Sequence, residues 1–516
     1  MKRWFNVAGP CRADVHYMLS ALDRLPNLIT LITEQNYFIL HAPRQTGKTT
    51  AMLAVAHELT TQGTYTAALL SVEVGAPFSD DPSAAEDAIL GSWRSDLCVR
   101  LPADLQPPPW PTALAGTRIR DALQAWSQAS SRPLVLFLDE IDALRDAALI
   151  SVLRQLRTGY TNRPAAFPWS VGLIGLRDVR DYKVAAGGSE RLNTASPFNI
   201  KTESLTLRNF SATEVAALYT QHTADTGQIF TPEACVRAFY LTQGQPWLVN
   251  ALARQATRVV APDLMTPITP AIIDQAKELL IQRQDTHLDS LAERLREERV
   301  RRVIEPIISG QVLGHVPDDD IRFVLDLGLC RMASGGGLEI ANPIYNEVVP
   351  RVLSNITFAS LPSINPTWLT ADGQLDTVQL LEAFLAFWRH HGELLLGSAP
   401  YHEIAPHLVM MAFLHRVING GGTIEREYAI GRDRMDLCLR YGDVTLGIEI
   451  KTWRNKRPDP LQAGLTQLDT YLARLSLSSG WLVIFDQRSD LPAIAERTTT
   501  QHVQTPAGRT VVVMYG

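Results

Sequence analysis

The stretch His41-Ala42-Pro43-Arg44-Gln45-Thr46-Gly47-Lys48-Thr49-Thr50 decides the fold of the first part of this chain. It follows Tyr37–Leu40, an apolar run that predicts a short buried strand, and it precedes Ala51–Ala56, which predicts a helix. A strand, a loop and a helix in this order present backbone N–H groups and a helix N-terminus to a phosphate. In such a loop Lys48 contacts the β- and γ-phosphate oxygens, and the Thr49 hydroxyl binds Mg²⁺. The pattern predicts a cradle for nucleotide phosphates with Mg²⁺.

Ala42 stands at the position where this motif usually has its first glycine. The departure is mild, because the position requires a small residue and Gly47 is retained. A chance Gly-Lys-Thr at a helix start is the alternative, and the flanking strand and helix argue against it. The residues expected to surround the nucleotide phosphates are Ala42, Pro43, Arg44, Gln45, Thr46, Gly47, Lys48, Thr49 and Thr50.

A second signature lies about ninety residues further along, where Leu134–Leu138 is followed by Asp139 and Glu140. Five apolar residues in a row predict a strand that is buried on both faces, as central strands of parallel sheets are. Such a strand delivers its two carboxylates at its C-terminal end, where ligands bind in α/β folds. We expect Asp139 to hold Mg²⁺ through water and Glu140 to polarise the water that attacks the γ-phosphate.

Further strands of the same sheet are expected at Tyr65–Val72, Trp169–Leu176 and Leu205–Leu207, from their apolar and β-branched content. Arg177 comes directly after the second of these runs. It either contacts the γ-phosphate or makes a surface ion pair. The lead-in Phe5–Leu31 also has two interpretations, since it either lies against the adenine or serves for packing.

Two other segments of the first part contain residues that typically interrupt or begin helices. Gly75–Trp110 is polar and contains a triple proline, which predicts an irregular excursion without helix. Ser211 and Glu214 form a capping box that opens a small helical lid. Within this lid, the glycine and proline of Thr242–Leu248 are expected to turn the chain toward the nucleotide.

Four features occur in the order that is typical of one ATPase family. They are the phosphate loop, the strand that ends in Asp-Glu, the fourth strand with a polar residue at its end, and the lid loop with Gly-x-Pro. This part of the chain resembles the AAA-like P-loop ATPases, close to the archaeal-type and signalling (STAND) NTPases. The resemblance implies an α/β fold with a parallel sheet and a helical lid, ATP and Mg²⁺ as cofactors, and homo-oligomers in which a neighbour's arginine reaches the γ-phosphate. No arginine matches a diagnostic finger motif. We place this domain at 1–262, with its lid at 203–262.

The middle of the chain, 263–360, predicts helices followed by a hairpin. Ile272–Ile308 is charged with apolar residues at helical spacing, and Asp318–Leu329 predicts another helix. Cys330–Met332 and Leu338–Ile340 flank a Gly-rich turn and predict a hairpin. This order resembles a winged helix. Because three aspartates open the second helix, a structural or autoinhibitory role is favoured over DNA reading. Residues 361–375, with Leu361–Thr367 as the clearest part, form the expected linker.

The last part, 376–516, contains a candidate metal site. Val444–Lys451 alternates apolar and other residues, so Glu449 and Lys451 share the face away from the core. A hairpin turn brings Asp436 from the preceding strand beside them. Two buried carboxylates are costly without a partner, and a divalent cation is the natural one. Mg²⁺ or Mn²⁺ would lie between Asp436, Glu449 and a scissile phosphate, with Lys451 orienting or deprotonating the attacking water.

Further residues extend this pattern on two predicted helices. Glu403 opens a helix upstream, and Gln467 and Tyr471 lie four apart on one face of a helix downstream. With Asp436 and the Glu-x-Lys strand, this order resembles the PD-(D/E)XK nuclease superfamily, particularly its RecB-like members. The resemblance implies a restriction-endonuclease-like α/β fold and roles for each site residue. The implied metal ligands are Asp436, Glu449 and Glu403, the catalytic lysine is Lys451, and the residues that orient the backbone are Gln467 and Tyr471.

Composition limits the partners. The 516 residues include 48 Lys and Arg against 54 Asp and Glu, a net charge of -6, so any contact with nucleic acid must be local. A local basic patch surrounds the Glu-x-Lys strand, made of Arg432, Arg434, Arg440, Lys451, Arg454, Lys456 and Arg457. The five cysteines have no CxxC spacing, which argues against zinc and disulfides and fits the cytoplasm. Without an h-region or a run of eighteen apolar residues, no membrane is expected.

The leading hypothesis is an ATP-gated, Mg²⁺-dependent nuclease acting on nucleic acid, with DNA as the first expectation, in DNA processing or defence against foreign DNA. The alternative is an ATP-dependent regulatory switch or scaffold whose nuclease-like domain binds nucleic acid or a partner without cutting. An ATP-driven motor is a third class, and no helicase motif follows the lid.

Overall fold

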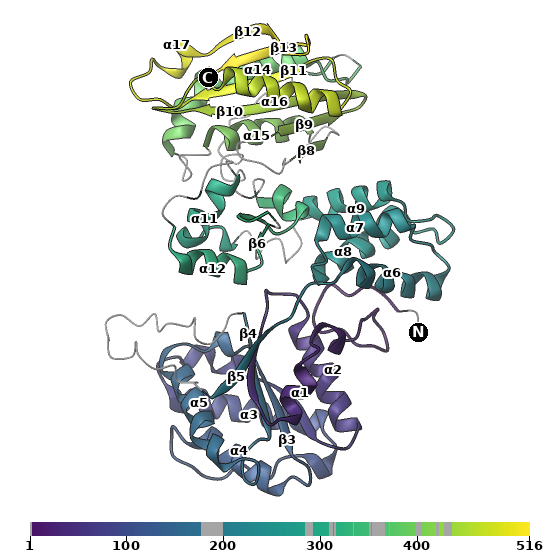
Figure 1. The fold of residues 1–516 in the computed structure, drawn as a ribbon, viewed down its shortest axis with the longest axis vertical. Helices are drawn as coiled ribbons and strands as arrows, with labels where there is room; N and C mark the ends of the chain where they lie inside the picture. The colour runs from purple at the N-terminus through teal and green to yellow at the C-terminus, as the bar shows by residue number, and fades with distance from the viewer. Residues whose placement is uncertain are drawn as a thin grey trace. The chain divides into compact units, whose positions relative to one another are not determined.

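A computed structural model describes residues 3–176, 200–283, 293–308, 313, 316–333, 335–349, 352, 367–370, 372–398, 405–418, 423–427 and 436–516 (Figure 1). The chain forms two compact units, the first made of 1–283 with 326–328 and the second of 284–325 with 329–516. Among the expected site residues, Arg177 and Glu403 lie outside the described residues, as do Arg432 and Arg434 of the basic patch and 361–366 of the expected linker. None of the described helices is both long and apolar enough to span a bilayer.

A five-stranded parallel sheet forms the centre of the first unit, in the order β2-β3-β4-β1-β5. Its strands are β1 (Tyr37–His41), β2 (Thr66–Ser71), β3 (Leu134–Asp139), β4 (Ser170–Gly175) and β5 (Lys201–Thr206). The α/β class and all five strands agree with the sequence expectation. All six residues of β3 are buried, because β3 lies between two strands and is covered on both faces.

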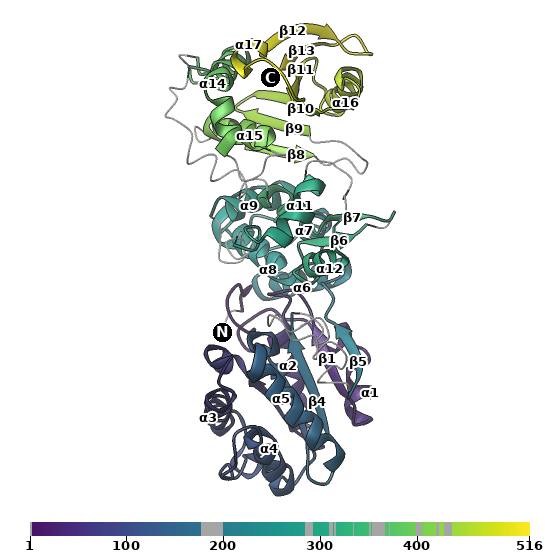
Figure 2. The ribbon, with the colours of Figure 1, turned by 90° about the vertical axis from the view of Figure 1, so that its left-hand side faces the viewer.

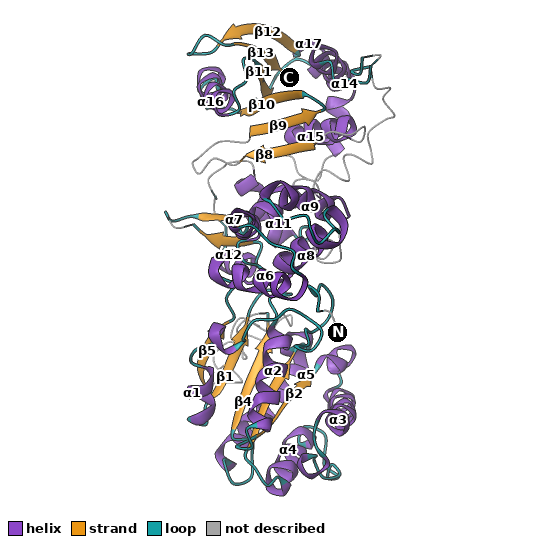
Figure 3. Cartoon of the chain, turned by 90° about the vertical axis from the view of Figure 1, so that its right-hand side faces the viewer, coloured by secondary structure: helices purple, strands orange, loops and turns teal. Residues whose placement is uncertain are grey.

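Helices cover both faces of this sheet, as the secondary-structure colouring of Figure 3 shows. On one face the apolar side chains of α1 (Leu28–Thr33) and α2 (Lys48–Thr61) pack on the strands. On the other face the packing helices are α3 (Pro82–Arg100), α4 (Arg118–Ala129) and α5 (Asp146–Gly159). The double cover explains why the strands are continuous apolar runs rather than alternating ones.

The expectation of an irregular Gly75–Trp110 segment is wrong, because α3 occupies most of it. Asp81 caps this helix by accepting a hydrogen bond from Ala84 N, and Pro82 fits the first turn, where its missing N–H is not needed. Ile89 and Trp93 are fully buried against the sheet. The apolar positions therefore follow a helical period up to Arg100, and the triple proline lies only beyond it.

The expected lid range, 203–262, contains α6 (Ala212–Thr226), α7 (Pro232–Thr242) and α8 (Pro246–Gln255), and α9 (Pro270–Arg283), beyond that range, packs on α7 and α8. The predicted capping box is confirmed, since Ser211 Oγ accepts from Glu214 N and Glu214 accepts from Ser211 N. The loop between α7 and α8 turns toward the phosphate loop, where Gln245 Nε2 donates to Gln45 O at 3.4 Å. Phe210 N donates to Gly244 O at 2.8 Å and ties this loop to the start of the lid.

The helices described after residue 284 in the middle of the chain include α11 (Glu298–Ile308), α12 (Asp318–Asp326) and residues 343–349, and the predicted hairpin is present as β6 (Cys330–Met332) and β7 (Leu338–Ile340). The expectation of helix throughout Ile272–Ile308 is wrong in part. Hydrogen bonds from Arg296 N to Glu293 O and from Glu297 N to Arg294 O tighten the chain into a turn just before α11. Arginines of α11 pair with the acidic start of α12, in the pairs Arg299 with Asp319 and Asp320, and Arg302 with Asp320.

A six-stranded mixed sheet forms the last part, in the order β12-β13-β11-β10-β9-β8. Its strands are β8 (Thr423–Glu427), β9 (Asp436–Tyr441), β10 (Val444–Trp453), β11 (Gly480–Asp486), β12 (Thr499–Gln504) and β13 (Thr510–Tyr515). Figure 2 shows α14 (Thr377–Ser398) and α15 (Ala405–Ile418) on one side of the sheet and α16 (Leu461–Arg474) on the other. The short α17 (Ile494–Arg497) precedes β12.

We predict that Gly244→Ala destabilises the first unit far more than Gly227→Ala. Both glycines have positive φ, +70° and +80°, so alanine is strained at either position. An added Cβ at Gly244 would lie 1.8 Å from the backbone oxygen of Phe210, whereas the one at Gly227 meets nothing within 4 Å. The expected losses of unfolding free energy are at least about 3 kcal/mol and about 1 kcal/mol. Urea denaturation measures both, and equal losses would contradict the described lid.

We also predict that the Arg208–Glu214 ion pair makes stability depend on pH. Hydrogen bonds from the Arg208 guanidinium lower the pKa of Glu214 to about 2. An unfolded glutamate has a pKa of about 4.3. The contribution of Glu214 is therefore complete above pH 4.3 and is lost as pH falls through 2. The difference in unfolding free energy between wild type and Glu214→Gln should shrink over this range, and a difference that is independent of pH would exclude the pair as its source.

Candidate functional site

The predicted phosphate loop joins the C-terminal end of β1 to the first turn of α2. Gly47 is the N-cap of α2 and has φ +91°, a conformation that glycine adopts without steric cost. Thr46 is almost fully buried, and its hydroxyl donates to Pro43 O at 2.9 Å, which closes the loop on itself. Ala42 is also buried, among apolar residues of the α1 and α2 face. A small side chain is therefore accommodated where the motif usually has glycine.

Lys48 lies over the loop, with its Nζ donating to Ala42 O at 2.7 Å and to Pro43 O at 3.0 Å. Burial lowers the pKa of the Lys48 ammonium, and the nearby carboxylates of Asp142, Glu140 and Asp139 oppose that shift. The present acceptors of this ammonium are thus neutral carbonyls at the edge of the loop. Phosphate oxygens would replace them as stronger, charged acceptors.

Thr49 and Asp139 come together although they are 90 residues apart, with Thr49 Oγ1 donating to Asp139 Oδ2 at 2.7 Å. A hydroxyl and a carboxylate at this spacing are oxygen donors of the kind that Mg²⁺ prefers. Asp139 is nearly buried at the end of β3, so this oxygen pair is held by the sheet. The residues present therefore fit the expected Mg²⁺, which Thr49 would hold directly and Asp139 through water.

Glu140 adopts φ +58°, a left-handed conformation that is uncommon for a residue other than glycine. Its N–H donates to Asp139 Oδ1 at 3.0 Å. Burial raises the pKa of Glu140, and the neighbouring carboxylates of Asp139 and Asp142 raise it further. Strained backbone and a perturbed carboxyl group in one residue are features that gather at functional sites.

These groups surround a cavity of about 380 Å³. It is lined by Gly9, Pro10, Arg44, Gln45, Gly47, Lys48, Thr49, Thr50, Glu73, Asp139, Glu140, Asp142, Gly175 and Leu176. A smaller cavity of about 70 Å³ lies beside it, between the lead-in, α2 and the lid. The lead-in serves for packing, since Phe5 packs on Tyr219 and Phe230 of the lid, and its Gly9 and Pro10 also line the larger cavity.

Sequence patterns missed two residues near this cavity. Asp142 lines it and accepts a hydrogen bond from Leu176 N at 3.2 Å through Oδ1. Arg24, which lines the smaller cavity, is buried beneath the phosphate loop. Asp142 follows Glu140 by two positions and could have been noticed as a third carboxylate at the same strand end, whereas nothing in the sequence around Arg24 distinguishes it.

In the second unit, β10 carries the predicted pair Glu449 and Lys451. Leu446, Ile448 and Ile450 alternate with them and pack in the core against α14 and α15, as predicted. Glu449 pairs in register with Leu482 and Lys451 with Ile484, two residues of the core on the α16 side. Glu449 is fully buried, and Lys451 Nζ lies 2.9 Å from its Oε1. The structure therefore brings this carboxylate and this ammonium together on the face covered by α16.

The two neighbouring strands, β9 and β8, each have an acidic residue in register with Glu449. Antiparallel pairing sets Asp436 of β9 directly across from Glu449, and Glu427 of β8 across from Asp436. Residues directly opposite in a ladder belong to the same face of a sheet. Among the side chains that the structure describes, no group of three or more His, Cys, Asp or Glu could hold a metal ion. Glu427 is an acidic position that the sequence pattern did not indicate.

The helix α16 lies against this face. An added Cβ at Gly447, two residues before Glu449, would lie 3.4 Å from the ring of Tyr471. The side-chain oxygen of Gln467 is buried and has no hydrogen-bond partner among the described residues. Beyond the pair, Trp453 of β10 stacks under Arg488 at 3.5 Å, and the exposed loop that follows carries Lys456 and Arg457. Tyr471 is thus close to the first half of β10, and part of the basic patch follows the end of this strand.

A comparison with family models identifies the domain that contains the first site. Residues 38–167 match the model of the ATPase family associated with various cellular activities, AAA. The chain therefore contains an AAA ATPase domain. Membership of this family implies that the domain binds a nucleotide and hydrolyses ATP. None of the curated proteins compared with the chain matches it.

Solved structures similar to this chain include the Walker-type ATPase PABY2304 of Pyrococcus abyssi, at 12% identity and a TM-score of 0.46, covering 67% of this chain and 99% of that one. The Orc1 protein of Aeropyrum pernix in complex with DNA has 14% identity and a TM-score of 0.35, covering 67% and 94%. The RuvB Holliday junction branch migration motor of Thermotoga maritima has 14% identity and a TM-score of 0.35, covering 63% and 92%.

We predict that Lys48→Ala removes nucleotide binding by the AAA domain without destabilising its nucleotide-free form. Lys48 is the first residue of α2, where a cation opposes the helix dipole, and its side chain is half-buried. Its loss should leave the nucleotide-free melting temperature equal or higher. Mg²⁺-ATP at 100 times its Kd should stabilise wild type by about 2.7 kcal/mol and the variant by nothing measurable. Thermal unfolding with and without Mg²⁺-ATP measures both effects, and a variant that is still stabilised by nucleotide would contradict the assigned role.

Proposed function

We propose that the protein is an ATP-gated, metal-dependent nuclease. In this proposal ATP hydrolysis by the AAA domain controls the last domain, which cleaves phosphodiester bonds, with DNA as the expected substrate. The observation that carries the second activity is the arrangement on β10. A fully buried carboxylate, Glu449, lies 2.9 Å from the Lys451 ammonium and directly across the ladder from Asp436. The AAA domain supplies the first activity.

In the AAA domain, the proposed division of labour follows the described contacts. Backbone N–H groups of the loop and Lys48 bind the phosphates, while Thr49 and Asp139 hold Mg²⁺. Glu140, at the strained position after Asp139, polarises the attacking water. The hydrogen bond from Gln245 to Gln45 O gives the lid a direct contact with the phosphate loop. Changes in the occupancy of the loop can thus be transmitted to the lid.

In the last domain, the donor set fits a hard divalent cation. Carboxylate oxygens at Glu449 and Asp436 are the ligands that Mg²⁺ and Mn²⁺ prefer, and burial of Glu449 favours a cationic partner. When bound, the metal would withdraw charge from the scissile phosphate and lower the pKa of a bound water. Lys451 would orient that water or take its proton. Gln467 and Tyr471, on the helix over the same face, would position the nucleic-acid backbone.

The exposed charges beside this site favour nucleic acid as the partner. Lys456 and Arg457 follow β10 directly and are exposed, so they can contact phosphates at the edge of the Glu-x-Lys face. The stacked pair Trp453 and Arg488 adds an aromatic ring at the end of the same strand. Single-stranded nucleic acid is commonly bound by a combination of basic and aromatic side chains of this kind.

A second candidate is a regulatory switch or scaffold whose nuclease-like domain binds nucleic acid or a partner without cutting it. The same ion pair favours it. Because Lys451 already neutralises Glu449 at 2.9 Å, the buried carboxylate has a cationic partner without any metal. The two candidates differ in whether metal-dependent cleavage occurs.

We predict that Asp436→Asn and Lys451→Ala each reduce metal-dependent cleavage at least about 100-fold, because the first removes a charged metal ligand and the second removes a cation that offsets charge in the transition state. The assay follows degradation of plasmid and single-stranded DNA with Mg²⁺ or Mn²⁺, with and without ATP. Asp469→Asn is the matched control, since this aspartate of the same domain pairs with Arg509 at 2.6 Å and has no proposed role in cleavage. Cleavage by this control should remain within about twofold of wild type.

Gating is tested in the same assay by Lys48→Ala, which should change the rate of cleavage or its response to ATP. Cleavage that is lost in Asp436→Asn and altered in Lys48→Ala would support the gated nuclease. Absence of cleavage with every metal and nucleotide, alongside ATP turnover that depends on Lys48, would replace it with the switch.

A further inference from the structure

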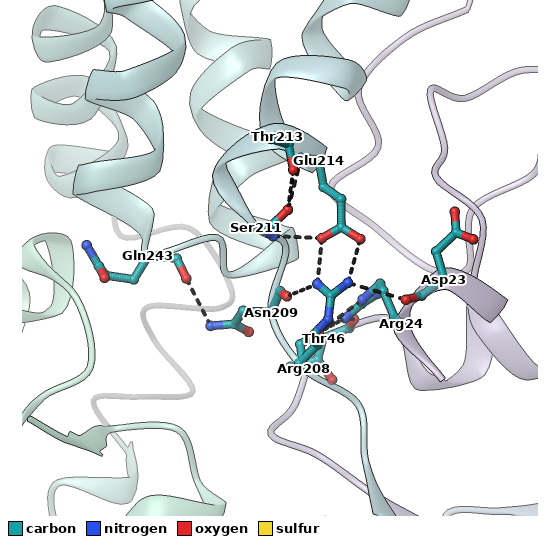
Figure 4. A network of polar contacts seen from close by, with 9 residues as sticks. All are labelled: Asp23, Arg24, Thr46, Arg208, Asn209, Ser211, Thr213, Glu214 and Gln243. Carbon is teal, nitrogen blue, oxygen red and sulfur yellow. Dashed lines mark hydrogen bonds and ion pairs between the residues drawn. The ribbon is translucent and has the colours of Figure 1, made fainter. Parts of the chain in front are cut away.

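Arg24 is a buried arginine that nucleotide chemistry alone does not explain. It is the last residue of the short helix η1 (Leu22–Arg24), in the lead-in, and only 7% of it is exposed. Figure 4 shows its guanidinium beside Thr46 of the phosphate loop and Arg208 of the connection between β5 and the lid. Three segments that are far apart in sequence therefore meet at one side chain.

One end of this contact is the phosphate loop. Arg24 Nη2 donates to Thr46 O at 3.1 Å, and an added Cβ at Gly47 would have Arg24 Nη1 as its nearest neighbour, at 3.8 Å. In a trans peptide the C=O and the following N–H point in opposite directions. By holding the Thr46 carbonyl on one side, Arg24 directs the Gly47 N–H to the other. Gly47 lines the larger cavity, so this N–H is one of the groups expected to cradle the phosphates.

The other end is the start of the lid. Arg24 donates to Arg208 O through Nε at 3.0 Å and also through Nη2, and its Cζ lies 4.8 Å from the centre of the Phe210 ring. Arg208 returns the contact, because its own Nη2 donates to Asp23 O at 3.3 Å. The Arg208 guanidinium also forms the ion pair with Glu214 in the capping box of α6. The lead-in and the lid are thus joined by reciprocal hydrogen bonds.

The charge of Arg24 is kept at an energetic cost. Burial lowers the pKa of its guanidinium to about 10, so it stays protonated at neutral pH. Among the described residues, its hydrogen bonds go only to main-chain carbonyls. A buried cation without a paired carboxylate is costly, and a polyanion bound in the adjacent loop would offset that cost. A neutral side chain of similar size would pack here more cheaply, which argues that the charge and its two-sided geometry serve ATP hydrolysis.

We propose that Arg24 is a positioning residue for ATP hydrolysis: it holds the Thr46 carbonyl and the Arg208 carbonyl in one arrangement, so that the phosphate loop and the start of the lid move together. This inference rests on the ATPase activity of the AAA domain and not on the proposed nuclease. The planar fork of arginine is needed because it reaches two acceptors at once, which a lysine ammonium on a flexible stem does not do in the same way.

The test compares Arg24→Met, Arg24→Lys and Arg163→Met in the full chain. Arg163 is a matched control, because it also donates to two main-chain carbonyls, Tyr160 O and Gln35 O, and stacks on aromatic rings, but outside the phosphate loop and the lid. The measurements are kcat and KM for ATP, the Kd of ADP and the nucleotide-free melting temperature. Arg163→Met should lower the melting temperature and leave kcat within about twofold of wild type.

Arg24→Met should lower kcat about 100-fold, as expected when reacting groups are misplaced by about 1 Å, and weaken ADP binding by less than about tenfold. Arg24→Lys should restore the Kd of ADP to within about twofold while kcat stays at least about tenfold reduced, because the charge is kept and the two-sided contact is lost. If Arg24→Met does not fold, the split between Kd and kcat in Arg24→Lys decides alone. Unchanged kcat in Arg24→Met, full recovery of kcat by Arg24→Lys, or equal losses of kcat in Arg24→Met and Arg163→Met would each overturn the proposal.

Discussion

The hydrogen bond between Thr49 and Asp139 joins residues that are 90 positions apart, and the first unit is arranged around the sheet edge where they meet. The strands β1 and β3 are parallel with β4 between them, so both end at this edge. The left-handed φ of Gly47 lets α2 begin there. A helix N-terminus, a lysine and acidic side chains are therefore gathered by strand direction, because parallel strands with short loops bring their C-terminal ends together.

Gathering these groups has an electrostatic consequence. Burial raises the pKa of Glu140 and lowers that of Lys48, so each group is held in surroundings that disfavour its charged form. The lid adds Gln245 from one loop, and Arg208 lies in the connection that precedes it. A site of this kind is poised for a ligand that carries both negative charge and a divalent cation, which is the combination that Mg²⁺-ATP supplies.

In the last domain, alternation along a strand and antiparallel pairing bring charged residues together on one face of the sheet. In β10 the residues alternate between faces, so Glu449 and Lys451 share the side that α16 covers, while Ile448 and Ile450 build the core. An antiparallel neighbour then places Asp436 at the same level. The ion pair of Glu449 and Lys451 shows that burying a carboxylate here requires a nearby cation. Whether that cation acts with a metal or in place of one separates the proposed nuclease from the switch.

Local sequence by itself determined the strands of the first sheet, the pair β9 and β10 of the second, the phosphate loop, the capping box of Ser211 and the alternation in β10, because each depends on neighbouring residues and on a period of two or of about 3.6. The helix α3 could also be predicted from the helical spacing of Ile89 and Trp93. The triple proline lies beyond the end of this helix and does not interrupt it. Only the tertiary structure decided the roles of Arg24 and Glu427 as neighbours of Thr46 and Asp436. Such pairings depend on how distant segments pack and on which strands pair in register, and neither leaves a periodic pattern in the chain.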